Sequence, residues 1–446
     1  MAHRRAGGCA RVIAAYAEAF ERFTRNGSGK GPAELVARRR EAFDRFAALG
    51  FPTAKDEEWR FTPLGPIAGT AWGLGGPAAG APVREVDLAP FRFDQPDWTT
   101  LVFVDGRFDA GLSHRPALAG GVTVETIAEA LARDPALGAR VGTVAPLDTT
   151  PFAALNAAFA KEGAVVRVPA GATPVDPIHL LFVSTAAATG TCSQLRTLVV
   201  VEPGARARIV ESYVGLGEAR YFTNAVTELV VAEGARVEHC RIQRESESGF
   251  HIGLTHVDQA RDSHYRSFTL AMGGAIARHD LRARLGAENV ETLLYGLYLG
   301  RGEQLVDNHT VIYHDQPNCR SWEVYKGILD GKSHAAFNDK VFVKPAAQKT
   351  DAKQTNRNLL LSNTAKVDTK PQLEIFADDV KCTHGATVGR LDESAYFYLQ
   401  SRGIPRARAQ ELLTYAFAAE VVSEVESTPV REALDRLLRR RLRAEE

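Results

Sequence analysis

The sequence predicts a mainly β protein whose strand-rich core is flanked by helical regions at both ends. From about residue 163, short runs rich in Val, Ile, Leu, Thr and Tyr follow one another for roughly 200 residues without an amphipathic segment of helix length. This pattern argues against βαβ folds, which need a crossover helix between parallel strands. A Gly-Ala pair recurs at intervals near thirty residues, which is typical of the stacked coils of a β-solenoid or parallel β-helix. An antiparallel sandwich fits the strand pattern equally well, so residue pattern alone leaves both folds open.

Residues 1–95 are expected to be helical and then irregular. Residues 12–23 and 33–49 carry apolar side chains at steps of three and four, as amphipathic helices do. Gly50 ends the second of these segments. Residues 62–96 are rich in Gly, Pro and Ala, which predicts a loop or linker.

Residues 96–158 are predicted to form an α/β segment that leads into the core. Residues 101–104 followed by an Asp-Gly pair indicate a strand and a turn. Residues 125–133 predict a short helix that Thr123 could cap.

The β core is assigned to residues 159–390. Nine strands are predicted within it, at residues 165–168, 179–183, 195–201, 206–210, 227–231, 237–242, 290–299, 304–313 and 335–343. The Gly-Ala pairs begin at Gly171, Gly204, Gly234 and Gly286, and only the last interval departs clearly from thirty residues. Glycine suits the corners of coils because it tolerates positive φ.

Residues 391–446 predict a helical tail that docks a partner. Pro405 and Pro429 stand where they can open the second and third of three helices. The second helix carries an apolar stripe at three- and four-residue steps, made by Ala409, Leu412, Leu413, Ala416, Phe417 and Val421. Such a tail could also cap the end of a solenoid, but its two apolar faces favour docking.

Composition excludes several classes of function. Lys and Arg total 54 and Asp and Glu total 54, so the zero net charge argues against bulk binding of nucleic acid or anionic membrane. No run of about eighteen apolar residues predicts a transmembrane helix. The five cysteines are scattered and never spaced as CxxC, which indicates reduced thiols in a cytoplasmic protein. The chain alone therefore cannot supply a compact four-thiolate cluster site.

Cys382 and His384 are the candidate metal ligands. In a strand their side chains would point to the same face, about 7 Å apart. Thiolate and imidazole can both bind iron, but two ligands are too few, so a partner would have to complete the site. On these residues alone, a structural role is favoured, with Cys382 packed as a small apolar residue and His384 bonded to backbone.

Other polar residues are expected to be structural. His309 and His314 are five apart in a strand-rich segment and should face opposite sides. His256 is expected to take part in a hydrogen-bonded surface pair. Asn338 and Asp339 are predicted to lie at a coil corner.

Several longer motifs resemble the SufB/SufD family of iron–sulfur cluster assembly proteins. The most specific are TKPQLEI, ADDVKCTHGATVG and FYLQSRGI, which follow one another between residues 369 and 404. KDEEWRFTPL at 55–64, LVFVDGRF at 101–108 and DNHTVIYHDQPNCRSWEVYKGIL at 307–329 extend the resemblance over nearly the whole chain.

Two positions are more similar to the SufD branch than to SufB. SufB has a His-Glu-Ala where this chain has His384-Gly385-Ala386, and a cysteine where this chain has Asn356. The missing thiolate at Asn356 suggests that the principal sulfur-accepting cysteine belongs to SufB.

The resemblance implies a fold and a set of partners. The fold is a right-handed parallel β-helix flanked by helical regions. The partners are SufB, bound through the last coils, and the ABC-type ATPase SufC, bound by the C-terminal helices. Within the apolar stripe of the second helix, Leu412, Leu413, Ala416 and Phe417 are the predicted SufC-docking residues. Without SufB, a homodimer is also possible.

The resemblance further implies a scaffold without catalytic residues of its own, because SufC hydrolyses the ATP. His384 and, second, Cys382 would lie at the SufB interface and share a transient iron–sulfur cluster with SufB. No tightly bound cofactor is expected on this chain alone.

The rival hypothesis is a β-helical polysaccharide lyase or hydrolase, which would use carboxylates or an Arg in an exposed groove. An N-terminus that does not predict secretion and only four Trp for stacking on sugars argue against this enzyme.

Overall fold

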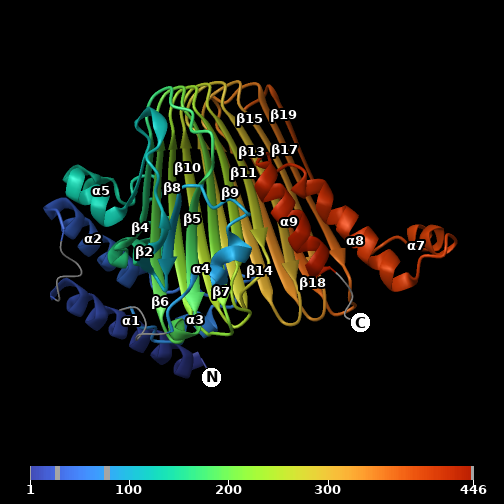
Figure 1. Ribbon diagram of the computed structural model, residues 1–446, viewed down its shortest axis with the longest axis horizontal. Coiled ribbons are helices and arrows are strands. Elements are labelled where there is room, and N and C mark those ends of the chain that lie inside the picture. The colour runs from blue at the N-terminus through green and yellow to red at the C-terminus, as the bar shows by residue number, and fades with distance from the viewer. Residues whose placement is uncertain (1, 26–30, 75–80, 443–446) are drawn as a thin grey trace.

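A computed structural model describes residues 2–25, 31–74 and 81–442, with no description of side chains before residue 12. Parts of the predicted terminal regions that fall on residues 1, 26–30, 75–80 and 443–446 lie outside this description. The protein is a β-solenoid with helices at both ends, as Figure 1 shows. None of the helices in the described ranges is long and apolar enough to cross a membrane.

The solenoid consists of two sheets that receive alternate strands. The ten-stranded sheet has the order β19-β17-β15-β13-β11-β9-β7-β5-β1-β2, and the nine-stranded sheet has the order β18-β16-β14-β12-β10-β8-β6-β4-β3. From β4 on, sheet neighbours pair in parallel, whereas β2 and β3 join as antiparallel strands. The strands are β1 (Thr100–Val104), β2 (Arg107–His114), β3 (Thr123–Thr126), β4 (Glu162–Val168), β5 (Ile178–Thr185), β6 (Cys192–Val201), β7 (Arg206–Leu216), β8 (Phe222–Val231), β9 (Arg236–Arg244), β10 (Phe250–Gln259), β11 (His264–Ala271), β12 (Ile276–Leu285), β13 (Glu291–Gly300), β14 (Leu305–His314), β15 (Arg320–Leu329), β16 (His334–Val343), β17 (Thr350–Leu360), β18 (Lys366–Ile375) and β19 (Val380–Gly389).

Parallel pairing decides between the two folds that the sequence left open. Arg206, Arg236 and His264 lie in register on successive coils, so the recurrence of about thirty residues is the length of one coil. Gly204 and Gly234 stack at one corner with φ of 66° and 65°, a conformation that favours glycine. The parallel β-helix is confirmed, and the antiparallel sandwich is wrong.

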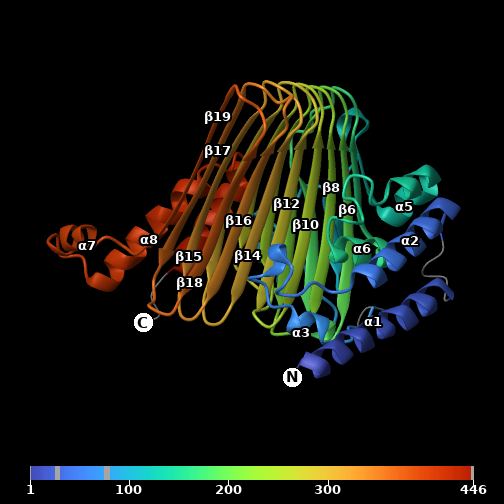
Figure 2. The same cartoon turned by 180° about the vertical axis from the view of Figure 1, so that it is seen from behind.

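Most of the N-terminal helices cover the first coils on the outer face of the nine-stranded sheet, as seen from behind in Figure 2, whereas α4 (Glu85–Leu88) packs on the ten-stranded sheet through Leu88. α6 packs on β6 and β8, and α2 packs on α6. Aromatic rings fill this layer. The Phe20 ring stacks on the Phe43 ring with 4.5 Å between centroids, and it meets the Phe159 ring edge-on with 5.5 Å between centroids. The helices of this region are α1 (Ala2–Arg25), α2 (Ala33–Leu49), α3 (Gly65–Ala68), α4 (Glu85–Leu88), α5 (Ile127–Arg133) and α6 (Pro151–Phe159).

Two expectations about this region need adjustment. The predicted loop at 62–96 contains the short helices α3 and α4. The cap of α5 is Thr126 rather than Thr123, because Thr126 Oγ1 accepts a hydrogen bond from the Glu129 amide at 3.2 Å.

Of three C-terminal helices, α8 (Arg406–Val422) and α9 (Thr428–Arg441) pack on the outer face of the ten-stranded sheet, whereas α7 (Glu393–Gln400) contacts α8. Val421 of α8 and Leu434 of α9 share one apolar cluster with Ile242, Leu297 and Ile328 of the strands. Figure 1 shows α9 and the adjoining part of α8 lying along the sheet, while the rest of α8 and α7 extend beyond the last strands.

Candidate functional site

The last coil of the solenoid has two free edges. β18 and β19 each end a sheet, bonded to β16 and to β17 on one side only. Each edge therefore offers backbone N–H and C=O groups to another strand. Apolar side chains accompany these edges, with exposed fractions of 38% for Ile375, 58% for Phe376 and 47% for Val388. The coil is open where a solenoid would ordinarily be capped.

Cys382 and His384 both lie on β19 and point toward the solenoid interior. They are in register with Ala352 and Gln354 of β17, which are buried in the lumen. Cys382 is half-buried against the lumen core, whereas His384 is exposed. Burial raises the pKa of the Cys382 thiol, opposed by a hydrogen bond to the backbone of Ala352. The thiol is therefore protonated near neutral pH.

These two residues cannot form a closed metal site by themselves. Across the described ranges, no group of three or more His, Cys, Asp and Glu is placed to hold a metal ion. Any site built on Cys382 and His384 needs ligands from elsewhere.

Asn356, the position that distinguishes the two branches, lies in the lumen one coil further in. It is 1% exposed and in register with Ala386. Its Nδ2 donates to the Tyr298 hydroxyl at 3.0 Å, and its Oδ1 accepts from Asn358 at 2.6 Å. The amide is thus held in a buried hydrogen-bonded network where no thiol is available.

The predicted docking stripe on α8 is partly occupied within the chain. Ala416 is exposed, whereas Leu412, Leu413 and Phe417 are half-buried. Lys326 Nζ lies 4.5 Å from the Phe417 ring centroid and donates to the Phe417 carbonyl at 3.0 Å. Phe417 therefore anchors α8 to β15.

Sequence reasoning missed the most exposed large apolar side chain of the tail. Phe397 of α7 is 74% exposed, and its neighbour Tyr398 is 55% exposed. The motif FYLQSRGI contains both, so two consecutive aromatics in a short helix were the available signal.

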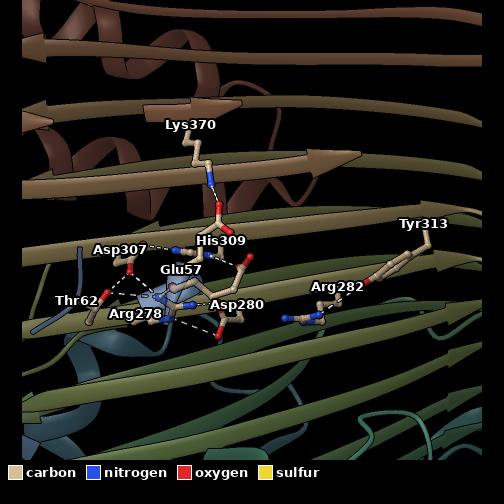
Figure 3. Close-up of polar contacts among 10 residues, drawn as sticks. Glu57, Thr62, Arg278, Asp280, Arg282, Asp307, His309, Tyr313 and Lys370 are labelled. Carbon is tan, nitrogen blue, oxygen red and sulfur yellow. Dashed lines mark hydrogen bonds and ion pairs between the residues drawn. The ribbon is translucent and has the colours of Figure 1, made fainter. Parts of the chain in front are cut away.

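A second polar cluster, shown in Figure 3, joins the N-terminal region to the outer face of the nine-stranded sheet. Arg278 forms ion pairs with Asp280 and Asp307, each at 2.8 Å, and its guanidinium lies 3.7 Å from the Trp59 ring centroid. His309 lies 3.0 Å from Asp307 and 3.4 Å from Glu58. This cluster fastens the turn at Glu57–Trp59 to β12 and β14.

Charge explains the pKa values in this cluster. Burial and the Arg278 guanidinium lower the pKa of His309, but Asp307 and Glu58 outweigh them and raise it above its usual value. The hydrogen bond from His309 lowers the pKa of Glu58 to about 2. His309 is thus a structural ion-pair partner, as expected.

Of the predictions for other polar residues, the one for His314 is confirmed and the one for Asn338 and Asp339 is wrong. His314 points into the lumen, where its Nε2 lies 2.8 Å from Ser321 Oγ, so it faces away from His309 as predicted. Asn338 and Asp339 do not lie at a coil corner; they are in the middle of β16, and the prediction is wrong. Strand alternation puts Asp339 on the lumen side of β16, between the core residues Phe337 and Val341.

Comparison with known proteins identifies the family of this chain. Residues 182–417 match the profile of the SUF system FeS cluster assembly SufBD core domain, and residues 11–180 match the SufBD protein N-terminal region. The chain belongs to the SufBD family. It is 35% identical over 407 residues to an iron-sulfur cluster assembly SufBD family protein of Synechocystis sp., covering 89% of each chain. It is 34% identical over 376 residues to the iron-sulfur cluster assembly protein SufD of Escherichia coli, covering 83% of this chain and 85% of that protein.

A third relative, SufD of Bacillus subtilis, is 27% identical over 300 residues, covering 67% of this chain and 68% of the relative. This SufBD-family protein is therefore SufD-like and a component of iron–sulfur cluster assembly. The matches give no support to a polysaccharide lyase.

Proposed function

We propose that this protein is a non-catalytic scaffold subunit that pairs with a SufB paralogue through its last coil and docks the SufC ATPase on its C-terminal helices. The observation that carries the proposal is the open last coil. Natural β proteins protect exposed edge strands, because unprotected edges invite pairing with another chain. Here β18 and β19 are both ten residues long and bonded on one side only, and apolar side chains accompany them, although Lys370 and Pro371 give β18 some protection. Such an end fits a surface that another solenoid completes.

The cluster would assemble at this joint as transient cargo. Cys382 and His384 point toward the lumen side of β19 and offer one soft and one borderline ligand. Because burial favours the neutral thiol of Cys382, an arriving iron ion has to displace its proton. The paralogue would supply the remaining ligands.

The C-terminal helices could transmit movement of SufC to the solenoid. α8 and α9 are fixed to the solenoid by the apolar cluster and by Lys326, while α7 extends outward with Phe397 exposed. ATP-driven movement of SufC against α7 and the Ala416 face of α8 would reach the last coils through this anchored pair. Such coupling requires that SufC binds two arrangements of the complex with different affinity.

The test is anaerobic co-expression of a tagged chain with its SufB and SufC counterparts, followed by purification and mass identification of subunits. Val388→Lys places a charge at the lumen-facing edge of β19 and should reduce the recovered SufB paralogue at least tenfold. Val175→Lys is the matched control, because Val175 is 80% exposed and lies before β5, far from the last coil. Equal recovery of the paralogue with Val388→Lys and Val175→Lys would refute pairing through this edge.

SufC docking is tested separately in the same purification. Phe397→Asp should lower recovery of SufC while leaving the SufB paralogue bound, since Phe397 is exposed and lies outside the solenoid core. Phe417→Asp is a weaker test, because its carboxylate would lie beside Lys326 and disturb the anchor of α8. Undiminished SufC with Phe397→Asp would exclude α7 from the docking surface.

A further inference from the structure

Most of the deeply buried carboxylates in the described ranges are matched by cationic or histidine side chains. Five of them are at most 4% exposed at the side chain, and each forms an ion pair or charged hydrogen bond: Glu211 with His239, Glu228 with Arg196, Glu245 with His251, and Asp280 and Asp307 with Arg278. This pattern is expected, because a buried charge without a partner is very costly.

Glu323 and Asp339 break this pattern. Each residue is 1% exposed, and in the described part of the chain neither forms an ion pair with Lys, Arg or His. Both carboxylate oxygens of Glu323 and Oδ1 of Asp339 have no hydrogen-bond partner. Burial and the nearby Asp339 carboxylate raise the pKa of Glu323, whereas the neighbouring Thr310 hydroxyl lowers it.

The surroundings add neutral oxygen donors. Gln354 lies beside Glu323 in register on β17, is 2% exposed, and has neither its Oε1 nor its Nε2 bonded. Thr310 lies beside Asp339 in register on β14 and is also 2% exposed. Buried polar groups in native proteins are almost always paired, so these unpaired atoms point to a partner that the chain itself does not supply.

We propose that Glu323, Asp339, Gln354 and Thr310 form a binding site for a hard divalent cation inside the solenoid. Two carboxylates supply the charge that the ion neutralises, and the Gln354 carbonyl and Thr310 hydroxyl complete an oxygen-only set. Oxygen donors without thiolate or imidazole suit Mg²⁺, Ca²⁺ or Mn²⁺ rather than softer metals. The ion takes the place that Arg or His occupies beside every one of the five matched carboxylates.

The site lies one coil inside the open end. Gln354 is in register with His384 of β19, so an ion that enters at the last coil meets Gln354 next. A part for this ion in cluster assembly rests on the proposed function, but its binding does not. The two can fail independently, because Mn²⁺ binding and recovery of the SufB paralogue are separate measurements.

The experiment is titration of the full chain, stripped of metal by a chelator, with Mn²⁺ followed by electron paramagnetic resonance of the free ion. The expected result is one tight Mn²⁺ site, weakened at least tenfold by Glu323→Gln and by Asp339→Asn. Glu374→Gln is the matched control, because Glu374 of β18 is 41% exposed at its side chain and pairs with Lys340. This control should bind Mn²⁺ as the wild type does.

Folding of the variants is checked by circular dichroism, and Gln354→Met provides a third variant that leaves both carboxylates in place. It should weaken Mn²⁺ binding measurably by removing one neutral ligand. A wild-type chain that binds no Mn²⁺, or variants that bind it unchanged, would overturn the proposal. An infrared band from a protonated carboxyl that persists at saturating Mn²⁺ would overturn it as well, because a proton would then be the counter-charge.

Discussion

At the scale of single residues, His309 shows how a charge network fastens one region to another. Its imidazole lies between Asp307 of the solenoid and Glu58 of the N-terminal region, beside Arg278 and Trp59. Glu58 and His309 are 251 residues apart in the sequence. Strand periodicity correctly predicted that His309 faces away from His314, but no local pattern could show which distant carboxylate it meets.

The raised pKa of His309 makes a pH-dependent contribution to stability. The protonated form is favoured in the folded state, so its contribution is complete below the unfolded value of about 6.5 and is lost as pH rises through the raised folded value. His309→Gln should lower the free energy of unfolding by about 1.5–3 kcal/mol at pH 6, with the difference shrinking as pH rises above 7. Urea denaturation of both proteins across this pH range measures the effect.

His264→Gln serves as the control for this series. His264 lies 3.2 Å from Glu291 but is 36% exposed at its side chain, where an ion pair contributes little. A difference between wild type and His309→Gln that is independent of pH would contradict the charged state assigned to His309.

At the scale of elements, some strands place apolar side chains on the outer face of the sheet and polar side chains toward the lumen, which is the reverse of the usual arrangement. In β9, Cys240 and Ile242 face outward under the C-terminal helices, while His239 and Arg241 face the lumen. All nine strands predicted from runs of apolar residues exist. Strands such as β12 and β17 were missed because both are rich in polar residues, on the outer face in β12 and toward the lumen in β17, and a pattern of apolar residues cannot detect them.

Lys326 ties α8 to β15, and its removal should loosen the C-terminal helices. Its side chain is 1% exposed, and Nζ contacts the Phe417 carbonyl at 3.0 Å and Glu420 at 2.5 Å. Lys326→Met keeps the buried stem but loses these bonds, and should lower the free energy of unfolding by about 1–3 kcal/mol. Denaturation by urea and limited proteolysis between α8 and α9 are the measurements.

Lys332→Met is the matched substitution, because Lys332 is 72% exposed at its side chain. It should change stability by no more than about 0.5 kcal/mol. Equal effects of Lys326→Met and Lys332→Met would show that α8 is held by its apolar face alone.

At the scale of the whole molecule, the two ends of the solenoid differ. The beginning is closed by antiparallel strands and by the N-terminal helices, whereas the last coil is bare. The sequence predicted a solenoid and placed Cys382 and His384 on its last strand. It could not predict the lumen pair Glu323 and Asp339, because their proximity depends on how successive strands face each other across the interior.

The bare end should make the isolated chain self-associate. In the absence of a paralogue, β18 and β19 can pair with the same edges of a second copy, which suits a closed dimer. Sedimentation equilibrium should show a concentration-dependent dimer whose dissociation constant rises at least tenfold in Val388→Lys. A chain that stays monomeric at high concentration, or a dimer indifferent to Val388→Lys and Val175→Lys alike, would contradict this expectation.

The order in which the ribosome makes this chain gives the C-terminal helices a further importance. Ile242, Phe268, Leu297 and Ile328 form an outer apolar surface that α8 and α9 cover, yet these helices are synthesised after all the strands. At typical translation rates, Ile242 waits about 10–40 s for the end of α9. Nascent coils would thus expose this apolar surface during synthesis, and a premature stop before residue 406 would leave it permanently accessible to chaperones and proteases.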